Sequence, residues 1–296
     1  MPDVLEQYVR EALSRSGLTP SRARGQHFLI DDGVLATVIR AAELDGSEIV
    51  LEIGPGLGTL TRSLAARCFR LHAYELDATL IRYLQGWVLP ETRNVVLHDS
   101  AFHVYALEKL IAEAREAGRP LKVVTNLPYQ ISAAFLHGIV EHYADVALTV
   151  VMLQREVAQR VTAHASEPNF SSFSLYIQTF LETRWVCDVP ADAFLPEPRV
   201  ESAVIRLSPL PPERQPQPRD RELYFKLVEG AFRKRRKQLA NAIQAAMPHL
   251  PMERIREALA TAGLALNVRA QDVEMAAWVR LADALATGPA DVQGQD

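Results

Sequence analysis

The alternation of apolar and polar positions divides the chain into short buried strands and amphipathic helices. From about residue 34, runs of β-branched and aliphatic residues alternate with stretches in which apolar residues recur at helical spacing. This pattern is typical of a wound α/β sheet. The last two strands have no clear helix directly between them, which favours an antiparallel addition at one edge. The predicted strands are 48–53, 70–75, 94–98, 121–126, 146–153 and 200–207, and the predicted helices are 58–67, 77–86, 104–117, 132–142 and 154–163.

A proline-rich segment marks the predicted domain boundary. Residues 208–220 (SPLPPERQPQPRD) contain five prolines and no apolar periodicity, so they predict an extended connector. After this segment, three stretches have helical periodicity, which indicates a small all-helical domain. We therefore predict a first domain over 1–207, a linker over 208–220 and a helical domain over 221–296. The three helical stretches are 221–247, 252–262 and 270–286.

Length and composition indicate a sizeable folded protein. The chain has 296 residues, 48% of them hydrophobic, which is enough to bury a real core. No stretch approaches the roughly 20 uninterrupted apolar residues of a membrane helix, and the N-terminus lacks the profile of a signal peptide. Cys68 and Cys187 lie far apart without a CxxC partner, so they imply neither a disulfide framework nor a zinc site. We expect a cytoplasmic, metal-free monomer.

The net charge of −4 excludes a uniformly basic nucleic-acid-binding surface. Phosphate contacts need Lys and Arg, so any RNA site on this chain must be a local patch. Two groups of cations are candidates, although a charge run is more often a solvated helix face. They are Arg22 with Arg24, and the run Arg233, Lys234, Arg235, Arg236 and Lys237.

A glycine-rich turn follows the first predicted strand. In residues 49–59 (IVLEIGPGLGT), Gly54, Gly56 and Gly58 allow a tight turn and the close approach of a ligand. Thr59 stands where the G-x-G-x-x-G motif of dinucleotide-binding folds would place a glycine. A purely structural strand-to-helix turn is the alternative. The loop favours a nucleoside-type ligand other than a dinucleotide.

Acidic residues end the next two predicted strands. Glu75 comes about twenty residues after the loop, where a carboxylate can accept hydrogen bonds from both ribose hydroxyls. Asp99 closes the following strand, where it can accept from an adenine amino group. The alternative for each acid is a helix N-cap. Taken with the glycine loop, the two acids predict an adenosyl site at the carboxyl edge of the sheet.

The tetrapeptide Asn126-Leu127-Pro128-Tyr129 at the end of the fourth strand points to the chemistry. An adenine amine is a poor nucleophile because its lone pair is delocalised into the ring. The side-chain oxygen of Asn126 and the carbonyl of Leu127 can accept its hydrogens and so favour a pyramidal nitrogen. Pro128 fixes the turn, and Tyr129 offers a flat face on which an extruded base can stack. The alternative is a strand-end turn with a core tyrosine.

Two further positions carry weaker indications. Phe194 precedes a double-proline loop and is a candidate second wall for the target base, although a core phenylalanine fits its spacing equally. His27 precedes the first predicted helix and is a candidate ligand contact, but a lone histidine beside aromatics is more often structural. Spacing alone leaves both alternatives open.

The ordered set of motifs resembles the KsgA/RsmA-type small-subunit ribosomal RNA adenine dimethyltransferases over nearly the whole chain. The glycine loop is common to many methyltransferases, whereas the complete set is specific. The resemblance implies a Rossmann-like S-adenosylmethionine-dependent methyltransferase fold with a helical C-terminal domain. The motifs are GQHFL (25–29), LEIGPGLGTLT (51–61), ELD (75–77), NLPYQIS (126–132), LQREVAQR (153–160), FLPEPRVESAV (194–204) and FRKRRKQLANAI (232–243).

This resemblance implies dimethylation of N6 on two adjacent adenosines near the 3′ end of small-subunit RNA. It implies S-adenosylmethionine as methyl donor, a late assembly intermediate of the small subunit (a pre-30S-type particle) as partner, and an RNA-contacting role for the basic run. An apolar stripe passes through Arg235 or Arg236 at helical spacing. At least one of these side chains should therefore extend along the domain interface, while its neighbours face solvent and RNA phosphates. The implied cofactor contacts are His27, Leu29, Gly54, Glu75, Asp99 and Asn126, to which the glycine loop adds Gly56.

Several positions depart from the family pattern without removing a catalytic group. Gln130 follows the tyrosine where many members carry Asn, and His98-Asp99-Ser100 replaces a commoner Gly-Asp-Ala. The segment 99–126 is longer than typical, and residues 170–174 replace a common Tyr-Gly-x-Leu-Ser pattern. The alternative functions are an assembly factor that has lost activity, a methyltransferase acting on large-subunit RNA and a DNA adenine methyltransferase. The intact acids and NLPY segment disfavour the first, and the absence of an evident base-reading domain disfavours the last.

Overall fold

The computed structural model describes residues 4–21, 25–234 and 237–286. Its contacts separate two compact units. The first combines Met1–Ala158 with Leu181–Pro209, and the second combines Gln159–Phe180 with Leu210–Asp296. The sequence analysis treats residues 1–207 as one continuous domain, whereas these contacts place 159–180 with the C-terminal helices. No helix within the described ranges is both long and apolar enough to cross a bilayer.

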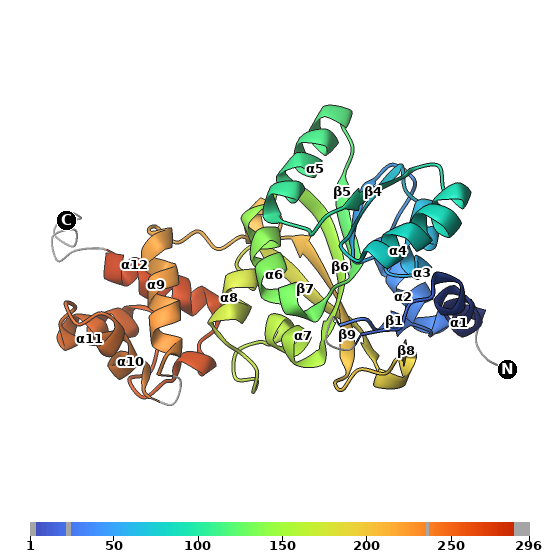
Figure 1. Ribbon diagram of the computed structural model, residues 1–296. Helices are drawn as coiled ribbons and strands as arrows, with labels where there is room; N and C mark the ends of the chain where they lie inside the picture. The colour runs from blue at the N-terminus through green and yellow to red at the C-terminus, as the bar shows by residue number, and fades with distance from the viewer. Residues whose placement is uncertain (1–3, 22–24, 235–236, 287–296) are drawn as a thin grey trace. The chain divides into compact units, whose positions relative to one another are not determined.

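A seven-stranded mixed sheet forms the centre of the first unit, in the order β4-β3-β2-β5-β6-β9-β7 (Figure 1). Strands β2 to β6 are parallel, and β9 lies antiparallel between β6 and β7. The predicted antiparallel addition is therefore correct for β9 and wrong for β6. The strands are β2 (Ile49–Ile53), β3 (Arg70–Glu75), β4 (Val95–Asp99), β5 (Leu121–Asn126), β6 (Val146–Gln154), β7 (Leu181–Val189) and β9 (Ser202–Pro209).

Hydrophobicity explains which strands the sequence analysis found. All five residues of β2 are buried because both faces of this central strand are covered, so four of the five are apolar and Glu52 is the exception. Strand β7, which the analysis missed, is the edge strand, and most of its residues are half-buried or exposed. Its sequence LETRWVCDV has no clear alternation, and its register shifts between Trp185 and Cys187. A bulged edge strand of this kind lacks the alternation of apolar and polar residues by which a strand is usually predicted.

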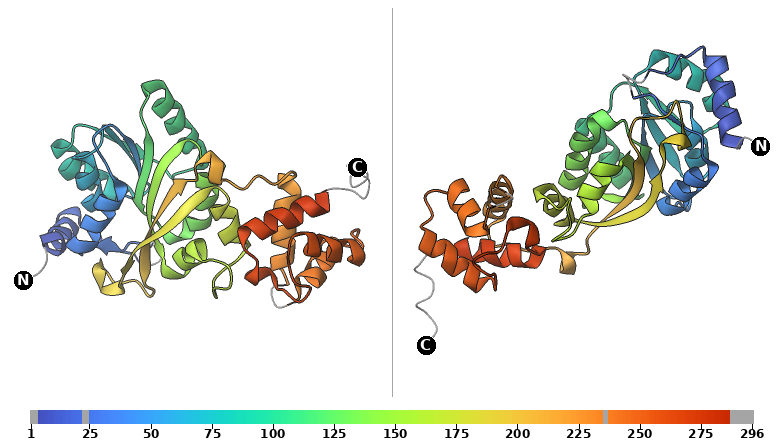
Figure 2. Two further views of the ribbon diagram at one scale, coloured as in Figure 1. Left: turned by 180° about the vertical axis from the view of Figure 1, so that it is seen from behind. Right: turned by 90° about the horizontal axis from the view of Figure 1, so that it is seen from below.

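Helices cover both faces of this sheet (Figures 1 and 2). The connections from β2 through β3 to β4 move toward one edge of the sheet, and those from β4 through β5 to β6 move toward the other edge. Because each connection is right-handed, the two groups of helices lie on opposite faces of the sheet. Helices α2, α3 and α4 cover one face, and α5 and α6 cover the other. The helices of this unit are α1 (Val4–Ser16), α2 (Asp32–Ala42), α3 (Thr59–Ala65), α4 (Ala78–Tyr83), α5 (Val104–Ala117) and α6 (Ser132–Glu141), and α7 (Arg155–Thr162) begins in this unit and ends in the second.

The first two helices, α1 and α2, lie outside the predicted elements. Helix α1 buries Leu5, Val9 and Ala12 and packs against α4. The side chain of Asp31 caps α2 by accepting from the N–H of Val34 at 2.8 Å. The predicted helix 77–86 is correct to Tyr83 and then continues as a π-helical turn over Leu84–Val88.

A separate two-stranded sheet joins distant parts of the first unit. Strand β1 (Phe28–Leu29) pairs antiparallel with β8 (Phe194–Leu195), so that Leu29 lies opposite Phe194. The N–H of Ile30 donates to the carbonyl of Ala193 at 2.8 Å and extends this pairing. The segment before α2 is therefore fixed to the loop that leads into β9.

The second unit is helical and has its own apolar core. Its largest fully buried side chains are Trp278 and Tyr224, packed with residues such as Leu259. The hydroxyl groups of Thr179 and Tyr224 lie 3.3 Å apart, which joins the end of the 159–180 segment to α9. The helices are α8 (Ser172–Gln178), α9 (Arg221–Phe232), α10 (Leu239–Ala246), α11 (Met252–Thr261) and α12 (Met275–Ala286).

The prediction of one continuous helix over 221–247 was wrong. Helix α9 ends at Phe232, and α10 begins only at Leu239, whose N–H donates to the carbonyl of Val268 at 2.7 Å. On a continuous helix Arg233 and Lys237 would lie four residues apart as like charges, which disfavours helix at this point. Arg235 and Arg236 lie outside the described residues, as do Arg22 and Arg24.

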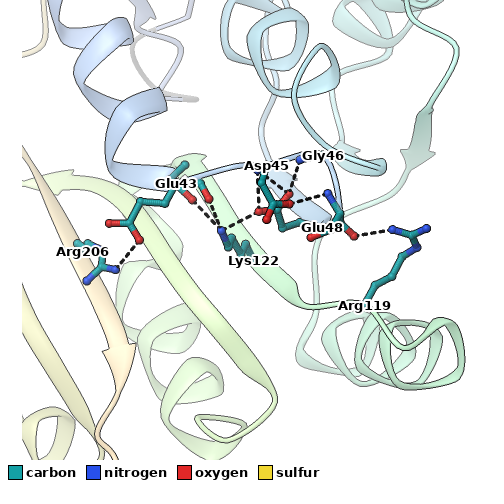
Figure 3. A network of polar contacts seen from close by, with 9 residues as sticks. Glu43, Asp45, Gly46, Glu48, Arg119, Lys122 and Arg206 are labelled. Carbon is teal, nitrogen blue, oxygen red and sulfur yellow. Dashed lines mark hydrogen bonds and ion pairs between the residues drawn. The ribbon is translucent and has the colours of Figure 1, made fainter.

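A buried ion pair supports the amino ends of β2 and β5 (Figure 3). The ammonium group of Lys122 lies 2.8 Å from Oε1 of Glu48, whose side chain is 1% exposed. Lys122 also donates to the carbonyls of Ala42 and Glu43 at 3.2 and 2.6 Å. The carboxylate of Glu48 accepts from the N–H groups of Asp45 and Gly46 as well. Both charges are therefore fully hydrogen-bonded, the condition under which a buried pair is tolerated.

We predict that Lys122→Met lowers the free energy of unfolding by about 3 kcal/mol, because it leaves the Glu48 carboxylate buried without its counter-charge. Denaturant titration of the purified variant measures this loss. The matched control is Lys109→Met, which changes an exposed lysine of α5 and should alter stability by about 0.5 kcal/mol or less. Equal losses in the two variants would contradict the assigned role.

Candidate active site

The strand order reverses between β2 and β5, and a cavity of about 620 Å³ opens at the carboxyl ends of these strands. This is the position at which ligands bind in open α/β sheets. Backbone pairing between the two strands stops at Leu51 and Val123. Beyond that point the hydroxyl of Thr125 donates to the carbonyl of Ile53 at 2.7 Å and accepts from its N–H at 3.2 Å. The Thr125 side chain thus replaces a pair of backbone hydrogen bonds at the point where β2 and β5 separate.

The glycine loop forms one side of the cavity. Gly54, Gly56 and Gly58 have φ of 70°, 59° and 79°, the left-handed region that favours glycine. A Cβ on Gly56 would stand 3.1 Å from the ring of Phe28, and one on Gly58 would stand 2.8 Å from Val88. The loop is therefore both turned and packed in a way that side chains would prevent, and Gly54 and Gly56 line the cavity.

Glu75 lies at the end of β3 and faces the same cavity. Its Oε1 accepts from the N–H groups of Leu76 and Asp77 at 2.8 and 3.0 Å, and Oε2 accepts from the N–H of Gly56 at 3.3 Å. Burial raises the pKa of this carboxyl, and the three backbone donors oppose that shift. Asp77, not Glu75, caps α4, so the N-cap alternative does not apply to Glu75.

The Asn126–Tyr129 segment forms the opposite side, and all four of its residues line the cavity. Leu127 is 1% exposed and donates its N–H to the carbonyl of Met152 at 3.3 Å. Tyr129 begins a single 3₁₀ turn over Tyr129–Ile131, closed by the Ile131 N–H donating to the Pro128 carbonyl at 3.2 Å. The two segments meet closely, since a Cβ on Gly54 would stand 3.3 Å from Pro128.

The β1–β8 sheet contributes a third wall. His27, Leu29 and Phe194 all line the cavity. The Nδ1 atom of His27 lies 2.7 Å from the carbonyl oxygen of Pro196, to which it donates its hydrogen. Phe194 is 2% exposed and belongs to an apolar cluster, so it is a core residue and a cavity wall at once.

Asp99 occupies a less enclosed position. It pairs in register with Glu75 across β3 and β4, so it lies at the same sheet edge. Its side chain is exposed, and the lining of the cavity continues instead with Ser100, Ala101 and Phe102. Helix α5 has His103 at its N-cap, so Asp99 does not have the alternative role of a helix cap.

Glu52 is a cavity residue that the sequence analysis missed. It lies in β2 and is 1% exposed, and among the described residues its Oε2 atom has no hydrogen-bond partner. Burial, together with repulsion from Glu75, raises the pKa of Glu52 to about 8. An alternating strand pattern would have revealed a buried acid, but β2 is apolar on both faces and conceals it.

A stack of rings supports another part of the lining. The ring of Tyr74 lies parallel to that of His98, with centroids 4.2 Å apart, and meets Phe102 edge-on at 5.7 Å. Nε2 of His98 lies 3.0 Å from Nδ1 of His72, and Oε2 of Glu113 lies 3.3 Å from Nε2 of His72. His98 thus replaces the commoner glycine with a side chain that packs against a cavity wall.

Gln26 is a second polar residue that the sequence analysis did not single out. Its side-chain nitrogen donates to Asp77 Oδ2 at 2.9 Å, and its side-chain oxygen accepts from the N–H of Ser21 at 2.9 Å. It therefore holds the N-terminal segment beside the carboxyl end of β3.

Of the predicted RNA contacts, the described Arg233, Lys234 and Lys237 are exposed, and Arg233 pairs with Glu229 at 2.6 Å.

The cavity fits a nucleoside ligand with a positive charge. The glycine loop leaves room where a Cβ would collide, and a carboxylate with a spare lone pair can accept from ribose hydroxyls. Two buried acids, Glu52 and Glu75, face the same space, and a cationic ligand would favour the ionised form of both. S-adenosylmethionine has this combination of adenosine, ammonium and sulfonium groups.

We predict that Glu52→Gln removes part of the pH dependence of stability. The folded protein keeps the Glu52 proton up to about pH 8, whereas the unfolded chain releases it near the ordinary value of 4.5. The folded state therefore binds more protons between these values, and its stability falls as pH rises through them. The stability of the variant relative to the natural protein should rise by roughly 3 kcal/mol from pH 5 to 8.

Denaturant titrations of both proteins at several pH values measure this difference. A constant difference for Glu52→Gln would mean that Glu52 is already ionised in the folded protein.

Solved structures of RNA methyltransferases have the same fold. A dimethyladenosine transferase from Plasmodium falciparum aligns with a TM-score of 0.69 at 22% identity, covering 86% of this chain and 96% of its own. The 23S rRNA methyltransferase ErmE aligns with a TM-score of 0.66 at 27% identity, covering 88% of this chain and 100% of its own. The predicted Rossmann-like methyltransferase fold with a helical C-terminal part is therefore confirmed.

Curated relatives match over almost the full length. The ribosomal RNA small subunit methyltransferase A of Lachnoclostridium phytofermentans is 34% identical, over 92% of this chain and 94% of its own. That of Acidothermus cellulolyticus is 36% identical, over 93% and 92%. The profile described as ribosomal RNA adenine dimethylase matches residues 20–287. The chain is therefore a methyltransferase and belongs to the ribosomal RNA adenine dimethylase family.

Proposed function

We propose that this protein dimethylates N6 of two adjacent adenosines near the 3′ end of small-subunit rRNA, with S-adenosylmethionine as methyl donor. One observation carries the proposal: the Asn126–Tyr129 segment and Glu75 line the same cavity, one on each side of the point where β2 and β5 separate. An amine acceptor thus faces the space in which an adenosyl group fits. The full-length similarity to small-subunit methyltransferases supports this target.

The residues on the β2–β3 side would hold the cofactor. Glu75 would accept from the ribose hydroxyls, Asp99 from the adenine amine, and Glu52 would face the positively charged end. The backbone at Gly54 and Gly56, with His27 and Leu29, would enclose the rest. When bound, S-adenosylmethionine supplies a methyl group on a sulfonium, which is an electrophile ready for transfer.

The residues on the β5 side would activate the target amine. Asn126 Oδ1 and the Leu127 carbonyl oxygen would each accept one N6 hydrogen, which turns the nitrogen lone pair toward the methyl carbon. These two acceptors would hold the amine with its lone pair free to take the methyl group, and the N6 proton that is released would pass to solvent. Tyr129 and Phe194 would hold the base between two aromatic surfaces.

The exposed cations Arg233, Lys234 and Lys237 would contact rRNA phosphates in a pre-30S-type particle. With them we propose Arg22, Arg24, Arg235 and Arg236, which lie outside the described residues. A cytoplasmic monomer that acts late in small-subunit assembly is the corresponding physiological form.

A large-subunit target is the second candidate, favoured by the similarity to the 23S rRNA methyltransferase ErmE. The small subunit is preferred because the relatives with that name are more similar, at 34% and 36% identity against 27%. Transfer of labelled methyl from S-adenosylmethionine to undermethylated small subunits, large subunits and duplex DNA, followed by nucleoside analysis, decides between them. Label in small-subunit N6,N6-dimethyladenosine supports the proposal, and label only in large subunits overturns it.

We predict that Asn126→Ala lowers the rate of methyl transfer at least a hundredfold and leaves particle binding within twofold. The lost acceptor acts mainly in the transition state, so its removal affects kcat more than affinity. Single-turnover kinetics and particle binding measure the two effects. Asn241→Ala, an exposed position in α10, is the matched control and should behave like the natural protein. Parallel losses of binding and rate would contradict the assignment.

We predict that Lys234→Glu with Lys237→Glu weakens particle binding and lowers the slope of log K against log salt by roughly 1.5 to 2, because two phosphate contacts are lost. Binding measured across a salt series tests this. The charge-matched control is Lys109→Glu with Lys226→Glu, two exposed lysines outside the run. A slope that matches the control would mean that the run is only a solvated surface.

A further inference from the structure

The hydroxyl of Tyr129 makes a contact that base stacking does not need. Its Oη lies 2.5 Å from the Oγ of Ser202. Stacking uses the face of a ring, so a phenylalanine at this position would stack equally well. A partly buried phenol nevertheless requires a hydrogen-bond partner, and here the partner is a single side chain from another strand. This contact therefore fixes where the edge of the ring lies.

Ser202 is held firmly enough to act as an anchor. It is the first residue of β9 and is fully buried, at 0% exposed. Its backbone lies between β6 and β7, in register with Gln154 on one side and Val189 on the other. A hydroxyl attached to a central strand of a sheet has little freedom to move.

The turn that carries Tyr129 is, by contrast, short and is held by fewer regular backbone hydrogen bonds. It is a single 3₁₀ turn, and 3₁₀ hydrogen bonds have poorer geometry than those of an α-helix. Besides the bond between Ile131 and Pro128, the backbone N–H and the hydroxyl of Ser132 both donate to the Tyr129 carbonyl, the hydroxyl at 3.0 Å. These contacts fix the backbone of Tyr129, whereas the contact with Ser202 fixes its side chain.

We propose that Ser202 is a positioning residue that holds the Tyr129 ring in the orientation required for the second of the two methyl transfers. The inference rests on the proposed function, in which Tyr129 stacks on the target adenine. Ser202 does not reach the reacting atoms and acts through Tyr129 alone.

The chemistry of dimethylation explains why the second transfer depends most on this contact. An unmodified adenine has two N6 hydrogens, one for Asn126 Oδ1 and one for the Leu127 carbonyl oxygen. After the first transfer N6 has a single hydrogen, so only one of these two acceptors can still hold the base. Stacking must then supply more of the orientation, and a ring that is free to tilt supplies less.

Ser202→Ala and Tyr129→Phe each remove one half of the contact and are the test variants. Tyr129→Phe leaves the strand untouched, so it keeps the test valid if Ser202→Ala folds poorly. Each variant should raise the ratio of N6-methyladenosine to N6,N6-dimethyladenosine in small-subunit RNA about fivefold to tenfold, since one hydrogen bond is lost. The double variant should give no larger ratio than either single variant, because both remove the same contact.

The matched control is Ser208→Ala, a half-buried serine of the same strand. It should leave the product ratio unchanged. A second readout uses the free protein labelled with 3-fluorotyrosine and ¹⁹F NMR, where the resonance that is lost in Tyr129→Phe identifies residue 129. Ser202→Ala should shift that resonance, and Ser208→Ala should not.

The outcomes separate this inference from the function on which it rests. If Asn126→Ala abolishes transfer but Ser202→Ala and Tyr129→Phe leave the product ratio unchanged, the role of Ser202 is overturned and the function stands. If the natural protein transfers no methyl group to small subunits, the proposed function fails, while a shifted fluorine resonance would still establish the contact. Additive effects in the double variant would also overturn a role that acts through Tyr129.

Discussion

The separation of β2 from β5 is the constraint on which the rest of the site depends. From this point the chain adds strands toward β4 on one side of the sheet and toward β6 on the other. No crossover connection therefore passes over the carboxyl ends between β2 and β5. The hydroxyl of Thr125 satisfies the N–H and carbonyl of Ile53 that the separation would otherwise leave unpaired. The glycine loop and Glu75, which the proposal assigns to the cofactor, lie on the β2 side, and the acceptors for the target amine lie on the β5 side.

Electrostatics gives this opening its preference for a cation. Glu52 and Glu75 are both buried and face one cavity, and burial raises the pKa of each. Backbone N–H groups compensate Glu75, whereas in the described residues Glu52 Oε2 has no such donor. A positively charged ligand therefore finds an acceptor that the protein itself leaves unsatisfied. At the amino ends of β2 and β5, by contrast, Lys122 provides the counter-charge for Glu48.

The sequence predicted the parts of the fold that local patterns control. Periodicity located the parallel strands because each contains neighbouring aliphatic residues, and glycine spacing located the loop. It missed the edge strand β7, where half-exposed residues remove the alternation, and it missed the break between α9 and α10, where Leu239 bonds to distant Val268. In the candidate site, motif order located Asn126 and Glu75. Glu52 and Ser202 depend on contacts across strands, which spacing does not show.

The two-stranded sheet of β1 and β8 makes two walls of the cavity mechanically dependent on each other. Leu29 and Phe194 are opposite in register, and His27 bonds to the Pro196 carbonyl, although these segments are far apart in the chain. A ligand that orders residues 27–29 therefore also orders the segment around Phe194, and the reverse holds with the same coupling free energy. In the proposed function, occupancy of the cofactor side would therefore favour binding on the base side, and a bound base would strengthen cofactor binding by the same amount.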